Sequence, residues 1–170
     1  MAQQQKPLTQ KERMLLQDQA KHEEICIQKY QNYAQQVQDP QLKQMLNTFA
    51  QQEQQHLNSI NQMLAGQMPS TGQGQQQGQQ AQNQQQSNQQ MQSTQSQSGG
   101  TFNPAGQHDA ALLTDLLMTE KYVSGAYDTA IFEFTCPQKR QILNHIQKEE
   151  QQHGEGIFNY MQSHGMYQPQ

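Results

Sequence analysis

Apolar and polar residues alternate along much of this chain with the period of an α-helix. Apolar or small side chains recur every three or four positions from residue 9 onward, and the same spacing resumes after Pro40. Asp39–Pro40 separates the two runs, because a residue before proline disfavours helical backbone whereas proline fits the first turn of a helix. Residues 1–66 are therefore predicted to form an antiparallel helical hairpin. The two stripes are Leu16, Ala20, Glu23, Ile27, Tyr30, Ala34 and Val37, and then Leu42, Leu46, Phe49, Glu53, His56, Ile60 and Met63.

The same pattern occurs a second time toward the C-terminus. Each stripe residue there follows an earlier stripe residue by 97 positions, and Cys136–Pro137 repeats Asp39–Pro40. This internal repeat predicts a second helical hairpin over residues 108–170. Its two stripes are Leu113, Leu117, Glu120, Ser124, Tyr127, Ile131 and Phe134, and then Leu143, Ile146, Glu150, His153, Ile157 and Tyr160.

Residues 67–107 have a different composition, because 17 of these 41 residues are glutamine and they show no apolar periodicity. Such a segment is typical of a disordered linker. As a flexible coil it reaches roughly 35 Å, which is about the length of a 25-residue helix. We therefore predict an all-α four-helix bundle in which residues 1–66 and 108–170 form one domain. The linker is the long crossover that joins the two hairpins.

Composition excludes several classes of partner. The net charge is −4 and the basic residues are scattered, so neither nucleic acid nor a membrane surface is expected to bind. The N-terminal residues form neither a charged nor an apolar signal region, which predicts synthesis and use in a cytoplasm-like compartment. In that compartment Cys26 and Cys136 are expected to be ordinary thiols.

A short motif, Glu-Gln-Gln-His, occurs once in each predicted hairpin, at residues 53–56 and 150–153. Its spacing places the glutamate and the histidine on the same face of a helix. A further glutamate lies 30 positions before each motif, and a rise of ~1.5 Å per residue puts it at nearly the same height on the preceding helix. Four carboxylates that converge in a core repel one another and each lose hydration. Such a core needs cations.

The residue types indicate which cations these are. A glutamate from each of two helices and Glu-x-x-His from each of the other two form the ligand set of ferritin-like proteins that hold two iron or manganese ions. Carboxylates and imidazoles suit iron or manganese, and a set without thiolates disfavours structural zinc. We therefore predict a di-iron or di-manganese site. By analogy with the ferritin-like ligand set, its expected ligands are Glu53 and Glu150 as bridging carboxylates, Glu23 and Glu120 as terminal carboxylates, and His56 and His153 as terminal imidazoles.

A single Glu-x-x-His is usually part of a solvated helix face, but two copies in register, each with a partner glutamate, favour the metal site. Glu24 and Glu149 adjoin ligand positions, and their phase on the helix favours solvent over a role beside the metal. Tyr30 and Tyr127 are predicted to pack in the core rather than bond to a ligand. The histidines that lie off the stripes are predicted to be surface residues: His22, His108, His145 and His164.

Three features of the last 60 or so residues are typical of one protein family. They are the run from Leu112 to Leu117, the Cys136–Pro137 turn, and the closing segments 158–161 and 165–169. In these features the chain resembles the Coat F family of bacterial endospore coat proteins, and its N-terminal hairpin is similar to the ferritin and rubrerythrin superfamily. The resemblance implies a ferritin-like bundle, a place in the spore coat after synthesis in the mother-cell cytoplasm, and other coat proteins as partners. The sequence leaves open whether the chain is a monomer or a homo-oligomer.

The chain departs from both relatives. Typical Coat F sequences have an incomplete ligand set, whereas all six positions are filled here, and the chain has no C-x-x-C rubredoxin segment of the rubrerythrin kind. Two functions therefore stay open. One is a coat protein whose metal pair performs oxidative or peroxide-removing chemistry. The other is a purely structural coat assembly protein with a vestigial or structural metal site, in which the glutamines of the linker are either cross-linked to lysines or act as a solubilising spacer.

Overall fold

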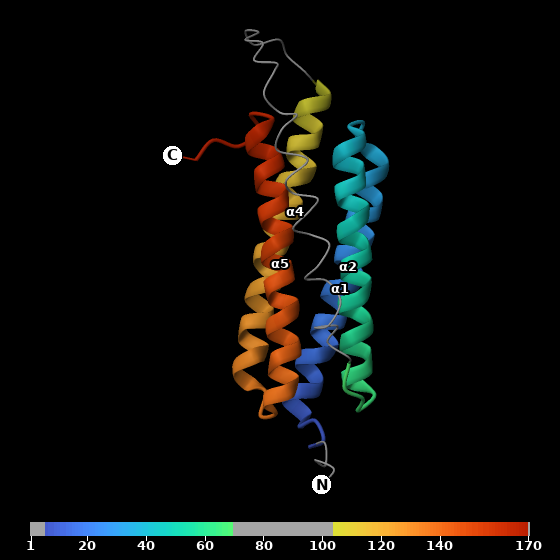
Figure 1. Cartoon of the computed structure of the whole chain (residues 1–170), viewed down its shortest axis with the longest axis vertical. Helices are drawn as coiled ribbons and strands as arrows, with labels where there is room; N and C mark the ends of the chain where they lie inside the picture. Colours follow the sequence, from blue (N-terminus) through green and yellow to red (C-terminus); the bar gives the residue numbers. More distant parts are fainter. Residues whose placement is uncertain (1–5, 70–103, 170) are drawn as a thin grey trace, which may run out of the picture. The chain divides into compact units, whose positions relative to one another are not determined.

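Four helices make up the part of the chain that the computed structural model describes, residues 6–69 and 104–169. The all-α four-helix bundle predicted from the sequence is confirmed (Figure 1). Of the predicted disordered linker, residues 67–107, residues 70–103 lie outside the described residues, and the last four are instead the first four residues of α4. The helices are α1 (Gln10–Gln36), α2 (Pro40–Leu64), α4 (Pro104–Glu133) and α5 (Pro137–Ser163).

Local signals in the sequence set the helix ends. Thr9 and Glu12 form a capping box at the start of α1, in which each side chain bonds to the backbone N–H of the other residue. Asp39 caps α2 by accepting a hydrogen bond from the backbone of Gln41, and Pro40 occupies the first turn. Cys136 has extended backbone before α5, as expected of a residue that precedes proline. Both predicted breaks between paired helices are thus confirmed.

The hairpins meet at one end of the bundle near the start of α1. There the Arg13 guanidinium donates a hydrogen bond of 3.2 Å to the carbonyl of Leu64 at the end of α2. The Glu12 carboxylate accepts one of 2.7 Å from the backbone N–H of Thr135, between α4 and α5. The start of α1, the end of α2 and the α4–α5 connection therefore lie together.

The remaining ends lie together at the opposite end of the bundle. The Tyr33 hydroxyl, near the end of α1, donates to Asp115 in the first half of α4 at 2.7 Å. The Tyr160 hydroxyl, near the end of α5, donates to Asp39 between α1 and α2 at 2.6 Å. Helices α2 and α4 therefore run in the same direction (Figure 1). Parallel α2 and α4 are the arrangement expected of a bundle with one long crossover, as the sequence predicts.

The core follows most of the predicted stripes, and the differences are in α2, where Phe49 is only partly buried and Ala50 is buried instead, and in α4. Leu113, Tyr127 and Phe134 are buried as expected, but Leu117, Ser124 and Ile131 are only partly buried. The fully buried neighbours of these three are Leu116, Val123 and Ala130. The physical reason is that α4 packs against both α1 and α5. Its buried face is therefore wider than one residue per turn.

Candidate metal centre

The structure brings all six predicted ligand residues together in the middle of the bundle. Each of the four helices contributes, α1 and α4 with one glutamate each and α2 and α5 with one Glu-x-x-His motif each. No member of the set is more than 2% exposed. Buried carboxylates in such a number are rare in proteins unless they are paired with positive charge. The six residues are Glu23, Glu53, His56, Glu120, Glu150 and His153.

The six residues divide into two overlapping groups. Within each group every residue offers one ligand atom, and these atoms all lie within 4.8 Å of one another. Glu53 and Glu150 belong to both groups, so each can present one carboxylate oxygen to either side. The first group adds Glu23 and His56, and the second adds Glu120 and His153.

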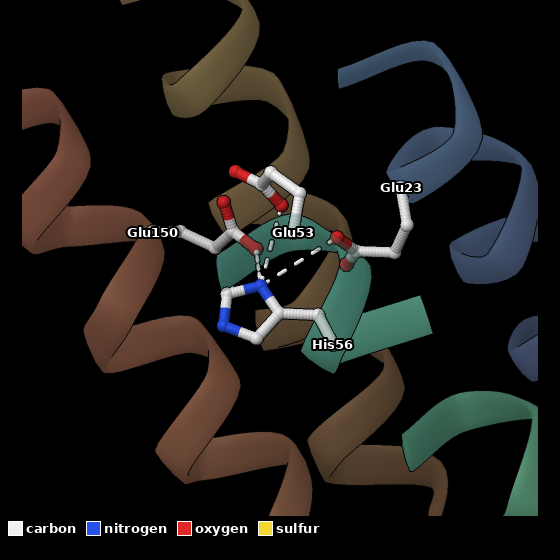
Figure 2. A group of neighbouring side chains, drawn as sticks. All are labelled: Glu23, Glu53, His56 and Glu150. Atoms are coloured by element: carbon white, nitrogen blue, oxygen red, sulfur yellow. Dashed lines mark hydrogen bonds and ion pairs between the residues drawn. The ribbon is translucent and has the colours of Figure 1, made fainter. Parts of the chain in front are cut away.

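The Nδ1 atom of His56 lies among three carboxylates from three different helices (Figure 2). It lies 3.1 Å from Glu150 Oε1, 3.2 Å from Glu53 Oε2 and 3.6 Å from Glu23 Oε2. A ring nitrogen carries at most one proton and can donate it to one acceptor. Three carboxylates around one nitrogen are therefore not explained by hydrogen bonding alone.

The second group repeats this arrangement around His153. Its Nδ1 atom lies 2.9 Å from Glu53 Oε1, 3.8 Å from Glu150 Oε2 and 3.9 Å from Glu120 Oε2. Glu53 and Glu150 thus turn one oxygen toward each histidine. The arrangement is the one expected of two carboxylates shared by two neighbouring cations.

Four carboxylate oxygens in these groups accept no hydrogen bond from the described residues. They are Glu23 Oε2, Glu120 Oε2 and both oxygens of Glu150, although Glu150 Oε1 lies in ion-pair range of His56. An unsatisfied buried carboxylate oxygen is costly, since its hydration is lost without replacement. Oxygen and nitrogen atoms that converge from all four helices fit a divalent transition metal. These buried groups can hold a metal ion.

Burial controls the ionisation of the carboxylates. It raises the pKa of Glu23 and of Glu150 to about 8, and that of Glu120 well above its ordinary value. Burial also acts to raise the pKa of Glu53, but hydrogen bonds from the two site histidines hold it well below its usual range. The four groups therefore ionise together only when positive charge lies between them.

Two tyrosines link each hairpin to the glutamate of the other. The Tyr127 hydroxyl of α4 donates a hydrogen bond to Glu23 Oε1 on α1, and the Tyr30 hydroxyl of α1 donates to Glu120 Oε1 on α4. Both rings are completely buried, as predicted for core residues. The hydrogen bonds were not predicted. They fix one oxygen of each carboxylate and leave the other oxygen facing the site.

Two polar residues outside the predicted set contact the far nitrogens of the histidines. Glu149 Oε2 lies 2.8 Å from His56 Nε2, and Gln52 Oε1 lies 3.1 Å from His153 Nε2. The prediction that Glu149 faces solvent is wrong in this respect, because its side chain is only 25% exposed and meets the other hairpin. Gln52 directly precedes Glu53 and Glu149 directly precedes Glu150, and that position was the available signal.

The surface histidines were assigned correctly in three positions. His108, His145 and His164 are exposed, whereas His22 is partly buried against Tyr122.

None of the described helices is long and apolar enough to cross a membrane.

The second hairpin matches a known protein family. Residues 108–170 match the family model of the Coat F domain. The chain carries a Coat F domain. The matched region comprises most of α4 and all of α5. The match supports the assignment of the chain as a spore coat protein. Searches of curated proteins and of solved structures returned no match.

The Coat F domain contains half of the clustered residues. Glu120, Glu150 and His153 lie within the matched region, whereas the three residues of the first hairpin lie outside it. Neither group is complete within the Coat F domain. A site built from both groups therefore depends on the N-terminal hairpin.

Proposed function

We propose that this protein is a spore coat component of ferritin-like fold that binds two iron or manganese ions and uses them in oxidative or peroxide-removing chemistry. The observation that carries the proposal is the pair of overlapping ligand groups that share Glu53 and Glu150. One group alone would suit a single ion. Two groups with two shared carboxylates provide for a pair.

Each of the six clustered residues has a defined part in this proposal. Glu53 and Glu150 would hold both ions, Glu23 and His56 would complete the first position, and Glu120 and His153 would complete the second. Iron or manganese bound there would supply the change of oxidation state that dioxygen or peroxide chemistry requires. Apolar residues above and below the site exclude bulk water, and among them Leu46, Ile60 and Leu113 are fully buried.

A location in the spore coat and other coat proteins as partners follow from the Coat F domain. The same domain favours a second function of a different class. In that function the bundle is a building block of the coat, and the ions only hold the two hairpins together. The two proposals share the metal site and differ in whether the bound ions catalyse a reaction.

Metal analysis of purified protein tests the shared part. Wild-type protein is expected to hold about two ions per chain after reconstitution with Mn²⁺ or Fe²⁺, and Glu53→Gln with Glu150→Gln is expected to hold fewer than one. The control is Glu24→Gln with Glu133→Gln, which removes two carboxylates that are 42% and 41% exposed. Equal metal content in wild type and the site variant would show that the site is wrong.

Turnover separates the two functions. The metal-loaded protein is assayed for consumption of hydrogen peroxide and for oxidation of Fe²⁺ by dioxygen, with the site variant as the blank. Catalysis above that blank supports the oxidative function. Stoichiometric metal binding that raises thermal stability but gives no turnover supports the structural one, since a ligand at 100 times its Kd stabilises a fold by about 2.7 kcal/mol.

A further inference from the structure

The two halves of the candidate metal centre differ in the side chain that contacts the outer nitrogen of each histidine. Gln52 and Glu149 occupy equivalent positions of the internal repeat, 97 residues apart, and each meets the outer nitrogen of the histidine on the facing helix. Several other polar contacts of the two halves correspond, although Nδ1 lies 3.2 Å from the motif glutamate in the first half and 3.8 Å in the second. Each has a terminal glutamate that accepts a hydrogen bond from a tyrosine, and both share the same two central carboxylates.

The contact geometry fixes how each histidine can act. The Nδ1 atom of each ring faces the carboxylate groups, so a ring that binds a cation does so through Nδ1 and carries its proton on Nε2. The Nε2 proton of His56 then points at a carboxylate oxygen of Glu149, 2.8 Å away. The Nε2 proton of His153 points at the neutral amide oxygen of Gln52, 3.1 Å away.

An ionised acceptor and a neutral one affect the imidazole differently. A hydrogen bond to a carboxylate is shorter and stronger than one to an amide, and it draws the Nε2 proton away from the ring. The electron density gained at Nδ1 makes the imidazole a stronger metal ligand. The carboxylate also adds a negative charge beside the first position, although His145 Nε2 lies 3.5 Å from the same oxygen, whereas the second position has only the amide dipole of Gln52.

We infer that Gln52 and Glu149 are positioning residues that make the two metal positions unequal, so that a divalent cation fills the position of His56 before that of His153. The inference rests on the proposed metal site and deepens it. The repeat supplies the same ligand types to both positions. The difference between an amide and a carboxylate at one repeat position gives the pair a fixed order of filling.

The test is a calorimetric titration of metal-free, full-length protein with Mn²⁺. Wild type is expected to show two binding events that differ in Kd by about 10- to 100-fold, the usual effect of a partner behind a metal-binding histidine. Glu149→Gln is expected to weaken the tight event by a similar factor and make the two events alike. Gln52→Glu is expected to strengthen the weak event and again make them alike.

The double exchange Gln52→Glu with Glu149→Gln is the matched control, because it keeps the composition and reverses the order. It is expected to restore two unequal events. Glu23→Ala and Glu120→Ala then assign each event to a position. In the wild-type background Glu23→Ala should remove the tight event and Glu120→Ala the weak one, and in the exchanged background the assignments should swap. Far-ultraviolet circular dichroism checks that every variant keeps its helical content.

The outcomes distinguish this inference from the proposed function. Two equal events in wild type, or unequal events that neither single exchange alters, would overturn the inference and leave the metal site standing. A wild-type protein that binds no Mn²⁺ and no Fe²⁺ would remove the proposed function and the inference together. Convergence of the two events in both single variants and their reversal in the double exchange support it.

Discussion

At the scale of single residues, the buried tyrosines connect the packing of the core to the ionisation of the site. The Tyr127 hydroxyl donates to Glu23, and nothing else among the described residues donates to that carboxylate oxygen. Tyr127→Phe keeps the ring and removes the donor. It is expected to weaken Mn²⁺ binding by about 10- to 100-fold, because partners behind a metal-binding carboxylate hold its orientation.

Tyr33→Phe provides the control for this prediction. Its hydroxyl donates to Asp115 at the end of the bundle, away from the six clustered residues. This variant is expected to lose about 1 kcal/mol of stability and leave the Kd for Mn²⁺ unchanged. Isothermal titration of both variants checks the pair, and equal affinity in Tyr127→Phe and wild type would contradict the role given to Tyr127.

Residue spacing made the six clustered residues predictable, but it did not reveal their neighbours. Glu-x-x-His places two side chains on one face of a helix, and the offset of 97 shows that the feature is repeated. The contacts of Gln52 and Glu149 depend on how closely two helices from different hairpins approach. A helical stripe indicates which face of a helix is buried. It does not indicate which side chains of another helix that face contacts. The hydrogen bonds of the two tyrosines were missed for the same reason.

At the scale of helices, Gly156 allows α5 to pass close to α2 beside the site. A Cβ atom at this position would lie 2.8 Å from Cζ of Phe49. The ring centroids of Phe49 and His153 are 4.5 Å apart. Gly156→Ala should therefore press Phe49 against a clustered histidine. Overpacking of this kind costs about 1 to 3 kcal/mol, which exceeds the gain of about 1 kcal/mol from better helix propensity.

Gly154 gives a matched comparison two residues earlier on the same helix. A Cβ atom there would make only ordinary contacts of 3.7 and 3.8 Å. Gly154→Ala is therefore expected to stabilise the protein by about 1 kcal/mol, whereas Gly156→Ala destabilises it. Urea unfolding of metal-free protein measures both. The same gain from both alanines would show that Phe49 has room to move.

Glu12 joins the start of α1 to the connection between α4 and α5. Its carboxylate is buried and accepts hydrogen bonds from the backbone of Thr9 and from the backbone and side chain of Thr135. Burial acts to raise its pKa, but these hydrogen bonds outweigh burial and hold the pKa below its ordinary value of 4.5. A depressed pKa in the folded protein means that ionised Glu12 stabilises the fold above pH 4.5. The contribution is lost as the pH falls through the folded pKa.

Glu12→Gln is therefore expected to destabilise the protein at pH 7 by about 1 to 3 kcal/mol. The difference in unfolding free energy between wild type and variant should shrink as the pH is lowered below 4.5. Urea unfolding of both proteins at pH 7 and near pH 3.5 measures it. Comparing the two at each pH removes the titration of the other carboxylates. A difference that stays constant with pH would mean that the charge of Glu12 is not what stabilises the contact.

At the scale of the whole molecule, the site belongs to the pair of hairpins and to neither alone. The match to the Coat F domain covers α5 and most of α4 and provides one terminal glutamate and one Glu-x-x-His motif. The N-terminal hairpin contributes the equivalent residues from the other side.

The architecture was predictable because the repeat, the two proline breaks and the length of residues 67–107 all agree with one topology. The chemistry at the site was predictable only as a set of ligand types, since spacing carries no information on the order in which cations bind.

The crossover topology gives a prediction about chain length between the hairpins. The end of α2 and the start of α4 lie at opposite ends of the bundle, so the connection must span about 37 Å, the length of the 25-residue helix α2. If residues 67–103 are replaced by about four Gly/Ser residues, the chain from Leu64 to Pro104 extends to roughly 25 Å at most. The first hairpin can then pair only with the second hairpin of another chain. Light scattering coupled to size exclusion is expected to show twice the wild-type number of chains per particle, whereas a replacement of about 30 Gly/Ser residues should keep the wild-type number. An unchanged number with the short connection would mean that α2 and α4 do not run in the same direction.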